Sequence, residues 1–598
     1  MESRKQQALD RRIAAAKLAY DRPQAQQQAN GEELRYRFDE PDTERGAHAS
    51  HLANYTKGLP HHEKDGLICN PADYQAFVRG IDSGDVRDFR DTPLGPKGTV
   101  NDGSLIEWKS QYTLRCSTPQ NPVDVRGWES AAAGLAFDLE GPDAQALAMP
   151  PAPTIDSDEL VAEVAEVYEM ALLRDIPFTE FETHPQVAAT IARLNNLDWF
   201  QGTDLAITDE AKARRRGPVT PQNLFRGTAF GDTEGPYISQ FLSRGTPELG
   251  GDRDGVLDGL VAYGAMVFDN KVRVATPHRD YMTSWEWWLD VQNGADLRSK
   301  ETYEDCGEKY RFITTPRDLA TYVHYDALYQ AYLNACLAMM AMGVPFDPGL
   351  PFQAPDRADH QQGFAHFGGP HILSLVTEVA TRALKAVRYQ KFNVHRRLRP
   401  EAIAGRIHQW RNTQLPSLAP VAQLSDHISD TLHKVALHNQ AQNQKYQAEM
   451  GADFGNCHEF DRDDVYLLPM AFPEGSPMHP SYGAGHATVA GACVTILKAF
   501  FDHGYVLPQP YVVSNANSDL CSVQDGHLML TVEGELNKLA ANISIGRNWA
   551  GVHYFTDYYE SARLGEQIAI GILQEQKLTY GENFSMSVPL FDGGCIRI

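Results

Sequence analysis

The sequence predicts a mainly α-helical protein of packed helical bundles with few short strands. From residue 311 onward, several long segments carry helical signals and are apolar almost all the way round, which is typical of helices in the middle of a bundle. The first 310 residues are richer in proline, glycine and charge, with turn clusters between modest helices. We therefore expect a helical scaffold and oligomerisation half, 1–310, packed as one compact unit with a helical-bundle half, 311–598.

Two segments of the N-terminal half are predicted to be helical. The opening residues, 1–20, are polar and favour an exposed helix. Residues 157–173, "SDELVAEVAEVYEMALL", place apolar side chains at i, i+3 and i+4, which indicates an amphipathic helix.

The C-terminal half carries the stronger helical signals. Thr315 is a suitable N-cap, Pro316 suits the first helical position, and Gly343 ends the pattern, so one helix of about 27 residues is expected here. Four further helices are predicted, at residues 371–392, 487–504, 535–545 and 558–576.

Composition excludes several classes of protein. The formal net charge of −24 over 598 residues argues against nucleic acid as a partner, because a phosphate backbone requires clustered lysine and arginine. No apolar run reaches 18 residues, which argues against a membrane span. The opening segment lacks the apolar core of a secretory signal, so we expect a soluble protein.

Eight cysteines without a CxxC pair predict neither a zinc site nor a disulfide scaffold. Cys336 and Cys493 lie in apolar helical runs and are expected in the core. The others are left open to pairing: Cys69, Cys116, Cys306, Cys457, Cys521 and Cys595.

The basic residues of this acidic chain gather in "RYQKFNVHRRLRPEA", which begins at Arg388. One interpretation is a solvated helix end whose cations complement the helix dipole. However, Pro400 pushes Arg399 out of helical geometry. Lys391 on the last helical turn and Arg399 on the following loop can then converge on one anion.

Two other segments place histidines beside glycines. In "IGRNWAGVHYFTD", Gly551 offers a break that lets Arg547 and His553 face one site, and Asp557 is placed to orient the imidazole. In "HPSYGAGHATVAGA", glycines precede His486 at the start of a helix. Each histidine alone is compatible with a structural role, and only the three segments together indicate a functional site.

Together these segments resemble the three-part oxyanion signature shared by vanadium-dependent haloperoxidases and type 2 phosphatidic acid phosphatases. Stretches such as "GWESAAAGLAFDLEGPDAQALAMPPAP", "RDLATYVHYDALYQAYLNACL" and "LTYGENFSMSVPLFDG" are similar to the vanadium bromoperoxidases of red algae and cyanobacteria. The resemblance covers nearly the whole chain from residue 30. It implies a vanadate enzyme that oxidises bromide with hydrogen peroxide to a hypobromous acid equivalent, which brominates small organic acceptors. It also implies a homo-oligomer as large as a dodecamer.

The resemblance implies which residues hold vanadate. His553 matches the ligand histidine, and Lys391, Arg399 and Arg547 match a cationic clamp on the vanadate oxygens. Gly485 would offer its backbone N–H to an oxygen.

Four residues match catalytic roles in the family. His486 matches the acid–base histidine, and Lys391 would also polarise the bound oxidant. His479 matches a position that favours bromide over chloride, and Arg388 is expected beside the halide.

Ala484 stands where the family usually has a serine whose hydroxyl donates to a vanadate oxygen. Loss of that donor is expected to cost about 1.5–3 kcal/mol. The sequence therefore predicts weaker vanadate retention with the chemistry intact.

A structural calcium site is also expected. The loop "PFQAPDRADHQQ" is rich in proline and in oxygen-bearing side chains that suit a hard cation. The resemblance implies ligands from Phe352, Ala354, Asp356, Asp359 and Gln361.

Two other functions are compatible with the same residues. In a phosphatase, His553 would be the nucleophile and His486 the acid for the leaving group. A non-enzymatic scaffold with an inactive site is the other alternative.

Overall fold

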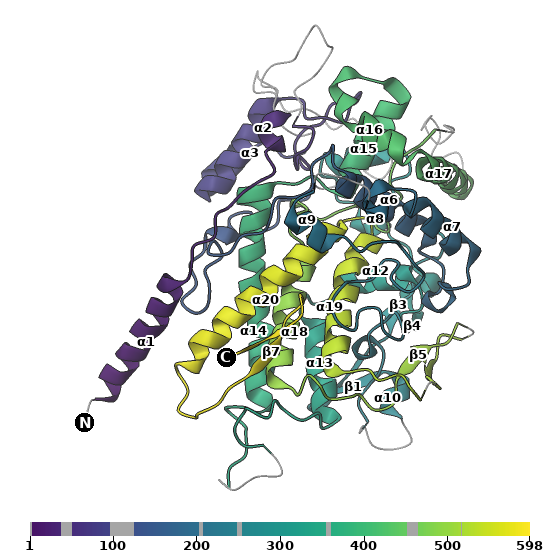
Figure 1. Ribbon diagram of the computed structural model, residues 1–598. Coiled ribbons are helices and arrows are strands. Elements are labelled where there is room, and N and C mark those ends of the chain that lie inside the picture. The colour runs from purple at the N-terminus through teal and green to yellow at the C-terminus, as the bar shows by residue number, and fades with distance from the viewer. Residues whose placement is uncertain are drawn as a thin grey trace.

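The fold is mainly α-helical, as predicted, and is seen here in a computed structural model (Figure 1). The structure describes residues 3–36, 51–95, 125–202, 207–247, 254–353, 360–450, 464–515, 517–524 and 526–598. The helices of the N-terminal half are α1 (Arg4–Asp21), α2 (Glu32–Arg35), α3 (Pro71–Ser83), α4 (Val86–Asp91), α6 (Asp158–Leu173), α7 (Pro185–Leu194), α8 (Asp198–Gln201), α9 (Asp209–Arg214), α10 (Gly255–Asp258) and α11 (Trp285–Gln292). Those of the C-terminal half are α12 (Pro316–Tyr325), α13 (Gln330–Ala341), α14 (Gly369–Tyr389), α15 (Pro400–Thr413), α16 (Ala422–His427), α17 (Ser429–Met450), α18 (Gly485–Phe500), α19 (Val532–Trp549) and α20 (Phe555–Lys577).

The strands are short and form antiparallel pairs. The pairs are β1 (Leu260–Tyr263) with β2 (Met266–Asp269), β3 (Val272–Arg273) with β4 (Tyr310–Arg311), β5 (Tyr511–Val513) with β6 (Leu520–Ser522), and β7 (Ser587–Pro589) with β8 (Cys595–Arg597). Short 3₁₀ turns connect other elements: η1 (Ala133–Leu135), η2 (Phe178–Glu180), η3 (Gln240–Leu242), η4 (Arg298–Lys300), η5 (Glu304–Gly307) and η7 (Pro416–Val421).

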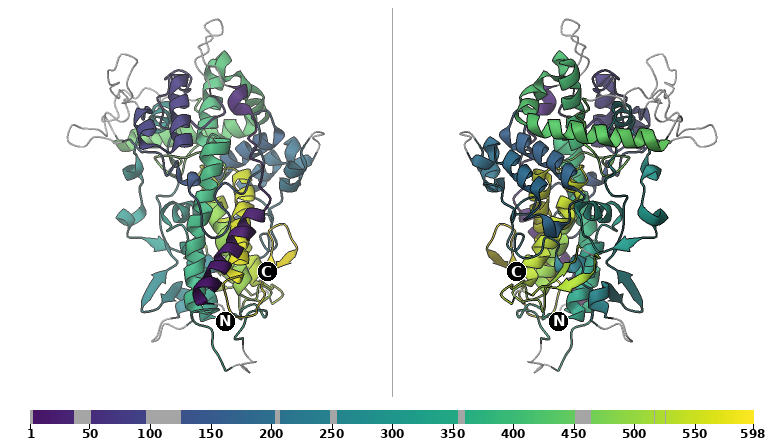
Figure 2. Two further views of the ribbon diagram at one scale, coloured as in Figure 1. Left: turned by 90° about the vertical axis from the view of Figure 1, so that its left-hand side faces the viewer. Right: turned by 90° about the vertical axis from the view of Figure 1, so that its right-hand side faces the viewer.

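Helix α18 lies at the centre of the bundle, packed against α14, α19 and α20 (Figures 1 and 2). All but one of its residues are buried, which explains its nearly continuous apolar sequence. Two glycines permit the close approach of α18 and α20. A Cβ on Gly491 would lie 1.9 Å from the carbonyl oxygen of Ala562, and one on Gly565 would lie 2.0 Å from that of Thr488.

The helix predicted between Thr315 and Gly343 is wrong as a single element. Helix α12 ends at Tyr325 and α13 begins only at Gln330. Asp326 leaves helical geometry with φ −59° and ψ 140°. The local sequence contains no residue that would end a helix here. The interruption coincides instead with a contact between Asp326 and a residue far away in the sequence, described below.

The remaining predicted helices are confirmed as α1, α6, α14, α18, α19 and α20. Helix α1 has no buried residue and extends away from the body of the protein (Figure 1). In contrast, α6 is almost entirely buried and packs against α7, α17 and α19. One large apolar cluster includes side chains of α6 as well as those of α18 to α20.

Cys336 and Cys493 are buried, as expected. The described cysteines are free thiols: Cys69, Cys306, Cys336, Cys493, Cys521 and Cys595. Cys116 and Cys457 lie outside the described residues. Within the described ranges, no helix is both long enough and apolar enough to cross a membrane.

Candidate active site

A buried lysine marks the end of α14. Lys391 lies in a π-helical turn, η6 (Gln390–His395), which replaces the regular last helical turn expected from the sequence. Its side chain is fully buried, and Nζ donates to the carbonyl oxygens of Pro480, at 2.7 Å, and Ser481, at 3.0 Å. The turn therefore ties α14 to the segment that leads into α18.

Arg399 joins two of the predicted histidines. It has extended geometry immediately before Pro400, as predicted, and is the N-cap of α15. Its Nη2 lies 2.7 Å from Nδ1 of His479, and its Nη1 lies 2.9 Å from Nε2 of His553. Arg399 also donates to the backbone carbonyls of both segments, since Nε reaches His479 and Nη1 reaches Val552. These bonds confirm that three segments, far apart in sequence, meet at one point.

His553 is oriented by a carboxylate. Gly551, with φ +86°, separates α19 from α20, as predicted. Nδ1 of His553 lies 2.7 Å from Oδ2 of Asp557. With its proton on Nδ1, His553 presents the lone pair of Nε2 to Arg399.

Asp557 is itself fixed by several donors. Arg397 donates to Oδ1 at 2.9 Å, and the Ser481 hydroxyl and the backbone N–H of Tyr554 donate to Oδ2. Burial alone would raise the pKa of Asp557, but Arg397 and His553 hold it well below its ordinary value. Asp557 is therefore a permanent anion behind the imidazole.

Asp326 was not singled out in the sequence, yet it contacts a predicted catalytic residue. Its Oδ1 lies 2.9 Å from Nε2 of His486, which is the second residue of α18. The break between α12 and α13 makes this contact possible because it turns residue 326 out of the helix.

Arg547 is held by the same end of α12. Nη1 of Arg547 donates to the carbonyl oxygen of Val323 at 2.6 Å, while its buried Nε has no hydrogen-bond partner in the described structure. Burial and the nearby Arg399 lower the pKa of Arg547 to about 10. Helix α12 thus positions both Arg547 and, through Asp326, His486.

Arg388 and His479 share one carboxylate. Oε2 of Glu129 lies 3.6 Å from Nη2 of Arg388 and 3.5 Å from Nε2 of His479. The Glu129 side chain is 42% exposed, whereas both of its partners are buried more deeply. Glu129 therefore lies on the solvent side of this pair and was missed because nothing in its local sequence marks it.

Ala484 is the N-cap of α18 and has no side chain to cap the helix. Its backbone N–H donates to Oγ of Ser561 at 2.8 Å. Gly485 begins the helix, and a Cβ at that position would meet only Leu384, at 3.7 Å. The protein therefore leaves space at Gly485, and any steric need for glycine would come from a bound ligand.

Burial and mutual repulsion both disfavour the charged forms of the basic side chains in this cluster. Burial and the charge of Arg399 lower the pKa values of Lys391 and His553 well below their ordinary values. Burial and the charge of Arg388 do the same for His479. A bound anion would relieve this repulsion.

The cluster fits a tetrahedral oxyanion that contains a metal. Arg399, Arg547 and Lys391 can donate to oxygens. The Nε2 lone pair of His553 accepts from Arg399 here and would bind the metal when that arginine donates to the oxyanion instead. The buried Nε of Arg547 and Nη1 of Arg388 have no partner in the described structure, so the protein itself leaves donors unused.

The predicted calcium loop is only partly described. Ala354, Asp356 and Asp359 lie outside the described residues. Phe352 has a left-handed backbone, with φ +67°, and Gln361 is exposed. Elsewhere in the described structure, no group of three or more histidine, cysteine, aspartate or glutamate side chains is arranged to hold a metal ion.

A helical bundle around a buried cluster of arginine, lysine and histidine is typical of enzymes that bind a tetrahedral oxyanion, either as substrate or as cofactor. The sequence model of the VCPO second helical-bundle domain matches residues 435–580. The vanadium-dependent bromoperoxidase of Corallina pilulifera is 50% identical, over 100% of this chain and 99% of the relative. The enzyme of the same name from Ascophyllum nodosum is 31% identical, over 91% of this chain and 86% of the relative.

A solved structure agrees with these relatives. The homohexameric structure of the second vanadate-dependent bromoperoxidase (AnII) from Ascophyllum nodosum matches with a TM-score of 0.77 and 27% identity, over 100% of this chain and 90% of that chain. The chain therefore belongs to the vanadium-dependent bromoperoxidases and is a haloperoxidase.

Proposed function

We propose that this enzyme uses vanadate, held at the cationic cluster, to oxidise bromide with hydrogen peroxide to a hypobromous acid equivalent that brominates small organic acceptors. The observation that carries the proposal is the orientation of His553. Asp557 fixes its Nδ1, so its Nε2 lone pair faces Arg399 in the cationic cluster. Bound vanadate would supply a Lewis acid that activates the oxidant without changing its own oxidation state.

In this proposal, His553 is the vanadium ligand. Arg399 and Arg547 grip vanadate oxygens as planar forks, and Lys391 acts as a point charge on the oxidant. The first backbone N–H of α18, from Gly485, is a further donor at a helix N-terminus. These groups neutralise a charge that would be expensive to bury without them.

His486 holds and releases the proton of the oxidant in this scheme. Its Nε2 faces Asp326, which leaves Nδ1 for the reacting site. The imidazole is 17% exposed, so it can exchange protons with water. Asp326 does not itself reach the site in this scheme and acts as a positioning residue.

Bromide is proposed to approach Arg388 and His479. Both carry proton donors that can face a halide, and Arg388 has an unused buried Nη1. Glu129 lies next to both side chains, so its carboxylate competes with bromide for them. Bromide can therefore bind only if the Glu129 side chain moves away, or if the attraction of bromide to the nearby cations exceeds its repulsion by Glu129.

We also propose that Ala484 weakens the retention of vanadate. Ala484 offers no side-chain hydroxyl at the N-terminus of α18. The charged donors Arg399, Arg547 and Lys391 are unaffected by the alanine. The chemistry therefore stays intact, but a higher vanadate concentration is needed to fill the site.

Two further parts of the proposal rest on sequence and relatives. The loop around Asp356 and Asp359 is proposed to bind calcium as a structural ion, and EGTA should then lower the melting temperature. The homohexameric relative supports assembly of this chain as a homo-oligomer. Sedimentation velocity would measure its size, up to the proposed dodecamer.

The decisive experiment titrates metal-stripped enzyme with orthovanadate. Bromination of a phenol dye is measured with bromide and peroxide, and hydrolysis of p-nitrophenyl phosphate is measured in parallel. Bromination that requires vanadate supports the proposal, and it should be lost in His553→Gln. Phosphate ester hydrolysis that vanadate inhibits, without bromination, would instead support a phosphatase in which His553 is the nucleophile.

A further inference from the structure

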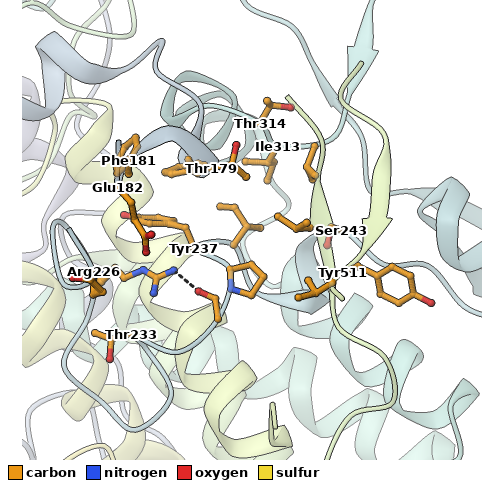
Figure 3. Close-up of a pocket in the computed structure, with 18 of the residues that line it drawn as sticks. Thr179, Phe181, Glu182, Arg226, Thr233, Tyr237, Ser243, Ile313, Thr314 and Tyr511 are labelled. Carbon is orange, nitrogen blue, oxygen red and sulfur yellow. Dashed lines mark hydrogen bonds between the residues drawn. The ribbon is translucent and has the colours of Figure 1, made fainter. Parts of the chain in front are cut away.

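A cavity of about 520 Å³ lies apart from the cationic cluster (Figure 3). Its walls come from η2 and the residues after it, from the segment 221–243, from Ile313 and Thr314 before α12, and from β5. None of the residues assigned above to vanadate or bromide lines it. Its volume is within the range of small-molecule sites.

The floor of the cavity is aromatic and rigid. Phe178 stacks on Tyr237 with ring centroids 4.2 Å apart, and Phe181 packs edge-on against Tyr237 at 5.9 Å. Tyr237 cannot turn freely, because its hydroxyl donates to the carbonyl oxygen of Phe225 and accepts from Nε1 of Trp549. The three rings are buried, and they offer a fixed surface for another flat apolar group.

One cation lies beside these rings. Arg226 is only 9% exposed, and its guanidinium carbon is 5.0 Å from the centroid of the Tyr237 ring. Its Nη2 donates to the carbonyl oxygen of Gly235 at 3.1 Å, the bond drawn in Figure 3. Within the described residues, no carboxylate forms an ion pair with Arg226. A buried guanidinium of this kind is normally paired with an anion.

The rim of the cavity limits the charge of a ligand. Thr179, Glu182 and Thr233 line the cavity and are exposed, so they lie on its solvent side. Burial lowers the pKa of Arg226, while Tyr237 and the carboxyls of Asp232, Glu535 and Glu182 act in the opposite direction. Arg226 is the only lysine or arginine among the described lining residues, and carboxyls lie near it, so a monoanion fits better than a dianion such as a phosphate monoester.

We propose that this cavity binds a small aromatic carboxylic acid, with its carboxylate on Arg226 and its ring on Phe178, Phe181 and Tyr237. The guanidinium has donors in addition to the one used by Gly235, and these can form charge-assisted bonds to the carboxylate. The aromatic floor selects a flat ring over a flexible chain. The site is independent of the chemistry proposed for the vanadate cluster.

The test uses 2-naphthylacetate as probe and the uncharged 2-naphthylacetamide as its matched control. Both are titrated calorimetrically into full-length enzyme with excess orthovanadate, without bromide or peroxide, so that the cationic cluster is filled. The acid should bind at least about tenfold more tightly than the amide. Equal affinities would overturn the proposal, and so would acid binding that disappears as orthovanadate is raised, because the acid would then occupy the vanadate cluster.

Variants locate the site. Arg226→Gln should remove the preference for the acid, and Glu182→Gln should increase the affinity for the acid by about two- to fivefold without affecting the amide. Glu180→Gln removes the same charge two residues away, at a position that does not line the cavity. It should change neither the affinity for the acid nor the affinity for the amide. A preference that survives Arg226→Gln contradicts the assignment. If Arg226→Gln does not fold, the comparison of acid with amide and the effect of Glu182→Gln still decide the matter.

Discussion

Asp326 Oδ1 lies 2.9 Å from Nε2 of His486, at the point where the chain leaves α12 and before it enters α13. The contact joins a helix break to the imidazole at the start of the central helix. Asp326 thereby fixes Nε2 of His486 and leaves Nδ1 for the proton transfer proposed above.

Asp326→Asn is expected to lower kcat for bromide oxidation by about 10–100-fold, since the imidazole loses the anion that orients it. Vanadate affinity should change less than about twofold, because Asp326 is assigned no bond to vanadate in our scheme. Steady-state kinetics and a vanadate titration measure the two effects. Asp326→Glu, which keeps the charge, should recover part of the rate. A parallel loss of vanadate binding would show that Asp326 supports the whole site rather than His486.

Ala484→Ser is expected to strengthen vanadate binding by about 10–150-fold, which corresponds to about 1.5–3 kcal/mol for a hydrogen bond to a charged group. The serine should also cap α18, because residue 484 already has N-cap geometry. That cap contributes about 0.5–2 kcal/mol to the free energy of unfolding.

The dissociation constant of vanadate measures the gain in vanadate affinity. Thermal unfolding of the metal-stripped protein measures the gain in stability from the helix cap separately. Ala484→Gly is the control for vanadate affinity, since it adds no hydroxyl, whereas glycine is itself a better N-cap than alanine. The same vanadate affinity in wild type and Ala484→Ser would contradict the proposed role of Ala484.

The sequence predicted which segments meet around Arg399 because the residue types themselves are informative. Lys391, Arg399 and Arg547 stand out in an acidic chain, and the effects of Pro400 and Gly551 on the backbone follow from local sterics. The helices of the bundle were likewise visible from their apolar patterns.

The parts that were missed depend on distant contacts. Asp326 lies inside a continuous helical pattern, and the break is accompanied by its contact with His486, 160 residues away. Arg397 belongs to the predicted basic segment, yet it pairs with Glu163 and Asp557 rather than with the oxyanion. No local signal distinguishes an arginine that binds a ligand from one that holds a carboxylate in place.

Asp557→Asn is expected to reduce vanadate affinity by about 10–100-fold, because an amide no longer requires the proton of His553 to stay on Nδ1. It should also destabilise the protein by about 1–3 kcal/mol, since Arg397 loses one of its two buried carboxylate partners but keeps Glu163.

Arg397→Met separates the two effects. It breaks the same buried ion pair but leaves the carboxylate beside His553, so stability should fall while vanadate affinity falls less than in Asp557→Asn. Equal losses of vanadate affinity in the two variants would mean that the fold around the site, and not the orientation of His553, sets retention.

Asp232 gives a prediction for the dependence of stability on pH. Burial raises the pKa of this carboxyl to about 7, although the Ala229 backbone, Lys538, Tyr558 and Arg226 each favour its ionised form. The folded state therefore keeps a proton that the unfolded chain loses above its ordinary pKa of 3.8, and the contribution of Asp232 to stability falls as pH rises from about 4 to 7.

Asp232→Asn should remove this part of the pH dependence, because an amide does not titrate. The melting temperature of the variant should rise relative to that of the wild type as pH increases from 4 to 7. Above pH 7 the difference should stay constant, because Asp232 of the wild type has then lost its proton in both the folded and the unfolded state. At pH 4 the two proteins should be similar, since the amide can replace the protonated carboxyl as acceptor for the Ala229 N–H. Thermal unfolding of both proteins in matched buffers measures this difference. A difference that does not change with pH would mean that Asp232 is already ionised in the folded protein, stabilised by Lys538 and Arg226 against the cost of its burial.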